Sequence, residues 1–150
     1  MDTESLLRSL KDHNVRFVVI GAFAFPVHGY SRATLDIDIF IESAAENAGL
    51  CREALIDFGY DLSDVSAEEI LTRKILIRQY LVETDIHPFV AGVTFEEVWK
   101  NKVTGKFGEV EAYFASLDDL IRMKKAAGRP KDIADLEVLS ELKKRSAPGT

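Results

Sequence analysis

The segment Thr34-Leu35-Asp36-Ile37-Asp38-Ile39 places two carboxylates two residues apart within an apolar run. On a β-strand such residues share one face, and their side chains are separated by about 7 Å along the chain. Two carboxylates held in this way repel each other unless a cation lies between them or water solvates both. A hard divalent cation with oxygen ligands, Mg²⁺ foremost, is the natural partner. The alternative is an edge strand whose polar face points to water, and the short Asp-Ile-Asp string alone does not choose between the two.

Gly21 and Ala22 follow a short apolar run and open a short helix in the pattern of the sequence. A glycine turn at the start of a helix leaves backbone N–H groups that can hold a phosphate. Phosphates beside Asp36 and Asp38 would need a bridging metal ion, which is the usual arrangement for phosphoryl and nucleotidyl transfer. This context favours the metal-binding interpretation over the solvated strand.

A third carboxylate on a neighbouring strand would complete such a site. The strand-like segment Leu81-Val82-Glu83-Thr84-Asp85-Ile86 offers Glu83 and Asp85, and spacing alone does not strongly favour either. His87 lies two residues beyond Asp85 and shares its strand face. A role beside the metal, or in supporting the metal ligands, is therefore one interpretation of His87.

Several polar side chains near these motifs could hold a triphosphate. Arg32 lies four residues before Asp36, and we expect it to hold a phosphate or to pair with an acidic residue across the site. Thr34 is on the same face as Asp36 and is a candidate hydrogen-bond donor. Arg129 and Lys131 lie at a helix junction, where cations can bind a triphosphate tail or an RNA acceptor. The alternative for these cations is a set of surface ion pairs.

Apolar spacing and turn residues predict the elements that would position these side chains. A buried strand over 16–20 and a short helix over 22–29 precede an alternating strand that starts at residue 34. Capping boxes at 43–46, 66–69 and 94–97 predict three helix starts. One or two strands over 74–87, a hairpin over 103–114, a helix closed by Gly128 and a final helix to about residue 145 complete the pattern. We expect the short helix to end at Gly29, with Pro26 tolerated only near its first turn.

The chain has 150 residues, of which 47% are hydrophobic and 29% are charged, which is enough for one domain with a buried core. The pattern predicts an α+β fold: a small mixed β-sheet flanked by helices, with further helices at the C-terminus. We expect a single domain over 1–145 and a flexible tail over 146–150. A single cysteine excludes internal disulfides and cysteine-cluster metal sites.

The net charge of −6 argues against a dedicated duplex-binding module, because neutralising phosphates needs a surplus of Lys and Arg. No run approaches 18 consecutive apolar residues, so no membrane-spanning segment is expected. The acidic start Met1-Asp2-Thr3-Glu4 does not fit a signal peptide, and the expected compartment is the cytoplasm.

Ile20-Gly21-Ala22, followed after a gap by Asp36-Ile37-Asp38-Ile39, resembles the signature of the minimal nucleotidyltransferase family in the DNA polymerase β-like superfamily. The gap is at the long end of that family's range. The strings over 21–34 and 124–136 are similar to a prokaryotic branch related to abortive-infection and toxin–antitoxin nucleotidyltransferases. The resemblance therefore covers nearly the whole chain.

The resemblance implies transfer of a nucleoside monophosphate from a nucleoside triphosphate (NTP) to a hydroxyl acceptor, either a protein side chain or an RNA end. Asp36 and Asp38 would bind two Mg²⁺ ions, with Mn²⁺ as the alternative ion. Asp85 would match the third carboxylate, which binds the metal near the acceptor hydroxyl and helps to deprotonate it. Gly21 and the amide of Ala22 would approach the triphosphate.

One departure from the family pattern concerns Ala22, since many catalytic members carry serine there and its hydroxyl contacts phosphate. A lost charge-assisted hydrogen bond is worth about 1.5–3 kcal/mol. The competing hypothesis is therefore a catalytically weak or inactive interaction protein that partners a toxin or antitoxin. A glycosyltransferase metal site is a further alternative, although 150 residues leave little room for a sugar-nucleotide domain. A homodimer through the last helix is also compatible with the sequence.

Overall fold

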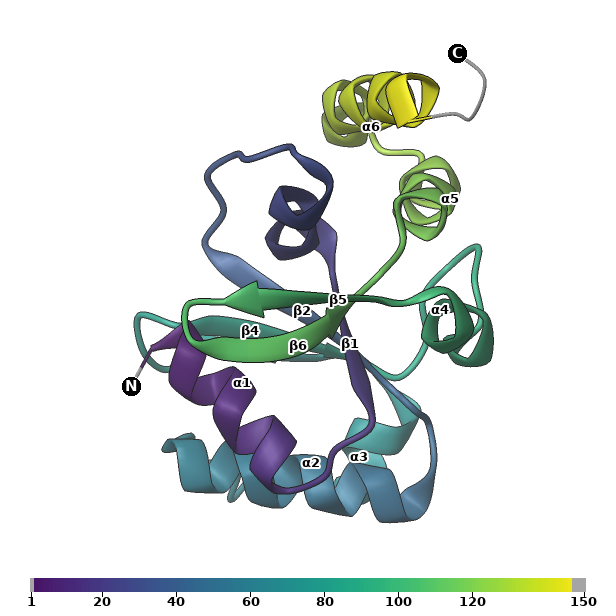
Figure 1. The fold of residues 1–150 in the computed structure, drawn as a ribbon. Coiled ribbons are helices and arrows are strands. Elements are labelled where there is room, and N and C mark those ends of the chain that lie inside the picture. Colours follow the sequence, from purple (N-terminus) through teal and green to yellow (C-terminus); the bar gives the residue numbers. More distant parts are fainter. Residues whose placement is uncertain (1, 147–150) are drawn as a thin grey trace.

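A computed structural model describes residues 2–146 of the chain. Its centre is one six-stranded mixed sheet with the order β3-β4-β2-β1-β6-β5 (Figure 1). The strands are β1 (Phe17–Ile20), β2 (Asp36–Ile41), β3 (Ile75–Ile77), β4 (Glu83–His87), β5 (Val103–Phe107) and β6 (Val110–Phe114). β2 runs parallel to β4, and β1 runs parallel to β6, while the remaining neighbours are antiparallel.

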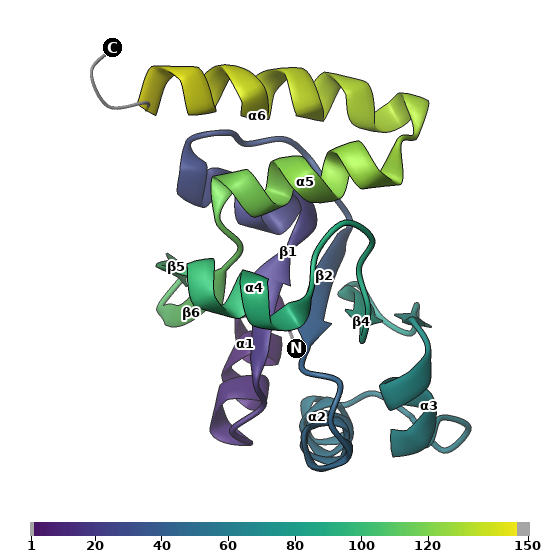
Figure 2. The ribbon, with the colours of Figure 1, turned by 90° about the vertical axis from the view of Figure 1, so that its right-hand side faces the viewer.

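Helices cover the sheet on two sides. They are α1 (Thr3–Asp12), α2 (Ala45–Phe58), α3 (Ala67–Thr72), α4 (Phe95–Asn101), α5 (Leu117–Ala127) and α6 (Ile133–Ser146), with the 3₁₀ segments η1 (Gly21–His28) and η2 (Pro130–Asp132). In Figure 1 the helices α1, α2 and α3 lie below the sheet, and α5 and α6 lie above it. Figure 2 shows α6 crossing over α5 at the far end from α2. The predicted α+β fold with a small mixed sheet and C-terminal helices is confirmed.

The two central strands explain how the fold holds its core. All four residues of β1 are buried, as expected for a β-branched, apolar strand covered on both faces. In β2 the apolar residues Ile37 and Ile39 are fully packed, whereas Asp36 and Asp38 on the other face remain partly exposed. The alternation in the sequence therefore sets which face of β2 carries the carboxylates.

The helix starts follow the capping residues with one exception. Ser66 and Thr94 form complete capping boxes with Glu69 and Glu97, as expected. The capping box expected over 43–46 is wrong, because α2 begins at Ala45 after Ala44, which has no capping side chain. The hydroxyl of Ser43 instead donates to the carbonyl of Leu71 and ties the start of α2 to α3.

The segment after β1 is a 3₁₀ helix rather than an α-helix. It ends at Gly29, which has a left-handed φ of +96°, as its position in the sequence indicated. Pro26 lies well inside the segment and not in its first turn. The prediction that this proline is tolerated only near the first turn is therefore wrong. Successive 3₁₀ turns do not need the i→i−4 hydrogen bonds that proline removes from an α-helix.

The C-terminal helices form a hairpin over one end of the sheet (Figure 2). α5 begins after the N-cap Ser116 and ends at Gly128, which the sequence predicts as its end. α6 includes Ser146, the first residue of the tail expected from the sequence, and residues 147–150 of that expected tail lie outside the described residues. Among the described helices, none is long and apolar enough to cross a membrane.

Candidate metal and nucleotide site

A cleft of about 790 Å³ opens between the sheet and the C-terminal hairpin. Its floor carries side chains from β2 and β4, one wall comes from η1 and the loop after it, and the other comes from α5, η2 and α6. The nine residues assigned to the site from the sequence all line this cleft: Gly21, Ala22, Arg32, Thr34, Asp36, Asp38, Asp85, Arg129 and Lys131.

The parallel pairing of β2 with β4 brings the carboxylates together. Asp38 lies directly opposite Asp85 in the strand register, and Asp36 lies opposite Glu83. Glu83 and Asp85 share one face of β4, which explains why spacing alone could not separate them. Asp85 is the one that lies across from Asp38, and its side chain is only 6% exposed.

Gly21 lets the backbone approach this pair. Its φ is +68°, in the left-handed region that glycine adopts without strain. A Cβ added here would lie 3.2 Å from Asp38 Cγ and closer still to a carboxylate oxygen. The turn from β1 into η1 is therefore packed directly against Asp38, and this packing requires glycine.

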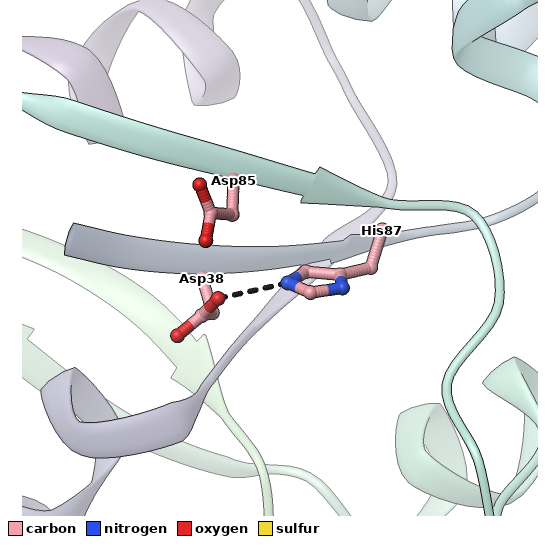
Figure 3. Close-up of side chains that lie close together, drawn as sticks. All are labelled: Asp38, Asp85 and His87. Carbon is pink, nitrogen blue, oxygen red and sulfur yellow. Dashed lines mark hydrogen bonds and ion pairs between the residues drawn. The ribbon is translucent and has the colours of Figure 1, made fainter. Parts of the chain in front are cut away.

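The side chain of His87 faces the same two carboxylates (Figure 3). Its Nε2 atom lies 2.8 Å from Asp38 Oδ1, and the imidazole is only 14% exposed. One donor atom from each of Asp38, Asp85 and His87 lies within 4.8 Å of the other two. Carboxylate oxygens and imidazole nitrogen are ligands that divalent ions take in proteins, so this donor set fits a metal ion.

Arg78 is a residue of the cleft that the sequence analysis missed. Its guanidinium lies 2.7 Å from Asp85 Oδ1, 3.6 Å from Asp36 Oδ2 and 3.8 Å from Glu83 Oε2. The hydrogen bond to Asp85 is the largest cause that raises the pKa of Arg78. In the sequence it is only an arginine that follows an apolar, strand-like segment. The strand order shows that this segment is the edge strand β3 next to β4, which brings Arg78 to the carboxylates.

Arg32 pairs with an acidic residue across the site, which is one of the two roles expected for it. Its Nε and one terminal nitrogen each donate to Asp135 of α6 at 2.8 Å. The hydroxyl of Tyr30 donates to the same carboxylate at 2.9 Å. Thr34 lies in the cleft, and its hydroxyl makes only a long 3.5 Å contact with the carbonyl of Asp36.

The cations of the C-terminal hairpin are also held by carboxylates. Arg129 Nε lies 2.8 Å from Asp132, and Lys124 Nζ lies 2.9 Å from Asp132 and 3.1 Å from Asp135. The hydrogen bond from Arg129 is the main cause that lowers the pKa of Asp132. Burial would raise the pKa of Asp135, but hydrogen bonds from Arg32 and Lys124 outweigh it and lower the pKa. These contacts fasten α5, η2 and α6 to each other.

Two lysines of the cleft are available to a ligand. Lys131 and Lys74 are both exposed and line the cavity. Within residues 2–146, neither has an ion-pair partner. Lys131 was expected at the site, whereas Lys74, which comes just before β3, was not.

A comparison with known families gives a match along nearly the whole chain. The family model described as "Nucleotidyltransferase of unknown function (DUF6036)" matches residues 1–145. No curated protein matches the chain. The resemblance to nucleotidyltransferases is confirmed at this level, whereas the branch related to abortive infection and toxin–antitoxin systems stays a prediction. The protein that arranges Asp38, Asp85 and Gly21 in this way belongs to that family of nucleotidyltransferases of unknown function.

Proposed function

We propose that the protein transfers a nucleoside monophosphate from an NTP to a hydroxyl acceptor with the help of divalent metal ions. One observation carries the proposal: β2 and β4 pair in parallel and set Asp38 opposite Asp85 on the floor of a large cleft. The family match and the close approach of Gly21 to Asp38 support it.

The carboxylates Asp36, Asp38 and Asp85 would hold the ions, Mg²⁺ or Mn²⁺. When bound, such ions neutralise the triphosphate and stabilise the charge that develops on pyrophosphate as it leaves. Lys74 and Lys131 line the cleft without an ion-pair partner among the described residues, which suits the binding of the outer phosphates. Arg32 and Arg129, which already hold Asp135 and Asp132, position the walls instead of binding phosphate directly.

The transfer itself is a substitution at the α-phosphorus of the NTP. The acceptor oxygen forms a new bond to this phosphorus, the bond to the oxygen that bridges the α- and β-phosphates breaks, and pyrophosphate leaves. Asp85 takes the proton of the acceptor hydroxyl, a role that requires its carboxylate to part from Arg78. The acceptor is a protein side chain or an RNA end, and a toxin–antitoxin or phage-defence setting is the biological context we propose.

A second candidate is an interaction protein that keeps the fold without turnover. Two observations favour it. The carboxylates of Asp85 and Asp38 already have hydrogen-bond partners, which are Arg78 and His87 respectively. Ala22 stands where many catalytic members of the nucleotidyltransferase family carry a serine that contacts phosphate. Calorimetric titration with ATP and Mg²⁺ separates the two candidates, because an interaction protein should show no binding at millimolar nucleotide.

Label transfer from NTPs tests the catalytic proposal. The wild-type protein is incubated with each α-³²P-labelled NTP, Mg²⁺ or Mn²⁺ and a cell extract, beside the variants Asp38→Asn and Asp85→Asn. The matched control is Asp64→Asn, which neutralises an exposed loop carboxylate away from the cleft. We expect labelled protein or RNA with the wild type and the control only. Equal labelling by all four proteins would contradict a catalytic role for the pair.

A further inference from the structure

We propose that His87 is a direct ligand of the divalent ion, together with Asp38 and Asp85, and that the resulting mixed site favours Mn²⁺ over Mg²⁺. This inference rests on the proposed function, because it concerns the metal of the same cleft. It goes further by making an imidazole the third ligand of the ion held by Asp38 and Asp85, which changes the class of ion that this position selects.

The distances between the donor atoms fit a shared ion. With bonds of about 2.1 Å, neighbouring ligands of an octahedral ion lie about 3 Å apart, and opposite ligands lie about 4.2 Å apart. His87 Nε2 and Asp38 Oδ1 are 2.8 Å apart, which is close to the spacing of neighbouring ligands. All three donor atoms lie within 4.8 Å of one another, so small side-chain rotations would bring them onto one ion.

The strand geometry holds His87 in this place. His87 is two residues beyond Asp85 on β4, so both side chains leave the same face of the sheet. In Figure 3 the imidazole turns back along the strand toward Asp38. The imidazole is only 14% exposed, so protein atoms and not solvent surround most of it.

The other carboxylate of β2, Asp36, lies outside this group of donors. Asp36 lies 3.6 Å from the guanidinium of Arg78 and is not part of the three-residue group. Among the described residues, the donor group formed around Asp38 and Asp85 therefore includes a nitrogen atom and not a third carboxylate oxygen. The membership of His87 in this donor group favours direct ligation of the ion over a role of His87 as a neighbour of the metal ligands.

The donor chemistry indicates the ion. Mg²⁺ binds oxygen ligands almost exclusively, whereas imidazole suits first-row transition metals. Mn²⁺ accepts both carboxylate and imidazole, so two aspartates with one histidine favour it over Mg²⁺. We therefore expect His87→Asp to return the preference to Mg²⁺.

Pulsed electron paramagnetic resonance of bound Mn²⁺ tests the ligation directly, without an activity assay. Mn²⁺ bound to the wild-type protein should show the ¹⁴N coupling of a ligated imidazole, and His87→Asn should abolish it. His28→Asn is the matched control, because His28 binds the carbonyl of Ala115 and should leave the coupling unchanged. Competition titrations should show that His87→Asp shifts the preference from Mn²⁺ toward Mg²⁺ by about tenfold or more.

The outcomes separate this inference from the proposed function. Mn²⁺ that binds in the cleft without ¹⁴N coupling, and whose affinity depends on Asp38, would overturn the ligation by His87 and leave the proposed function standing. Failure of the wild-type protein to bind Mn²⁺ or Mg²⁺, with or without an NTP analogue, would contradict both. If His87→Asn does not fold by circular dichroism, the wild-type spectrum alone decides, because a wild-type spectrum without ¹⁴N coupling refutes the ligation.

Discussion

Replacing Gly21 by alanine should weaken metal binding in addition to lowering the stability of the fold. At its φ of +68°, a residue with a Cβ is destabilised by about 1–2 kcal/mol. For a chain of this length, each kcal/mol lowers the melting temperature by about 2–4 °C, so the expected decrease is about 2–8 °C. The new Cβ would lie 3.2 Å from Asp38 Cγ and would force the Asp38 carboxylate to turn away.

Turning the Asp38 carboxylate breaks its 2.8 Å contact with His87 and withdraws one metal ligand. A lost interaction with a charged group is worth about 1.5–3 kcal/mol, which corresponds to Mn²⁺ binding that is about 10- to 100-fold weaker. Gly29→Ala is the matched control, since Gly29 has φ +96° at the other end of η1 and no atom within 4 Å of an added Cβ. This control should lose thermal stability and keep its affinity for Mn²⁺.

Differential scanning calorimetry and Mn²⁺ titration measure the two effects of Gly21→Ala separately. Wild-type Mn²⁺ affinity in Gly21→Ala, at a lowered melting temperature, would refute the steric reasoning about Asp38. An equal loss of affinity in Gly29→Ala would assign the effect to strain in η1 and not to the contact with the carboxylate.

Three further outcomes follow from the buried charges and the buried thiol. Lys124→Met should lower the free energy of unfolding in urea by about 1.5–3 kcal/mol, because Asp132 and Asp135 each lose one of their charged partners, whereas Lys125→Met at the exposed neighbouring position should have little effect. The hydrogen bond from Arg129 lowers the pKa of Asp132 below its usual 3.8, so this stabilisation is present above about pH 4 and is lost as the pH falls further. Urea unfolding between pH 3 and 6 should show this slope, and Asp132→Asn should reduce it. Burial raises the pKa of Cys51 to about 12, so a thiol reagent at pH 8 should label it only after unfolding.

The sequence was sufficient for most elements because local signals determined them. The alternation from Asp36 to Ile41 predicted both the strand and the face that carries its carboxylates. Ser66 and Thr94 marked helix starts through contacts within four residues. The same signal was wrong at Ser43, because its hydroxyl found a partner in Leu71, 28 residues away, which no local pattern reveals.

The site was harder to predict because its contacts join distant parts of the chain. The sequence offered both Glu83 and Asp85, and only the register with β2 distinguishes them. Arg32 and its partner Asp135 are 103 residues apart, so the sequence left open whether this arginine binds phosphate or a carboxylate. Arg78 escaped notice for the same reason, since its three acidic partners come from two strands whose pairing was unknown.

The most direct test of the central claim is a crystal of the full chain grown with Mn²⁺ and a non-hydrolysable NTP analogue. We predict an anomalous Mn²⁺ peak within about 2.2 Å of carboxylate oxygens of both Asp38 and Asp85, with the phosphates of the analogue beside it in the cleft. Nucleotide bound with Mn²⁺ at any other place, while Asp38 and Asp85 keep their contacts with His87 and Arg78, would contradict it.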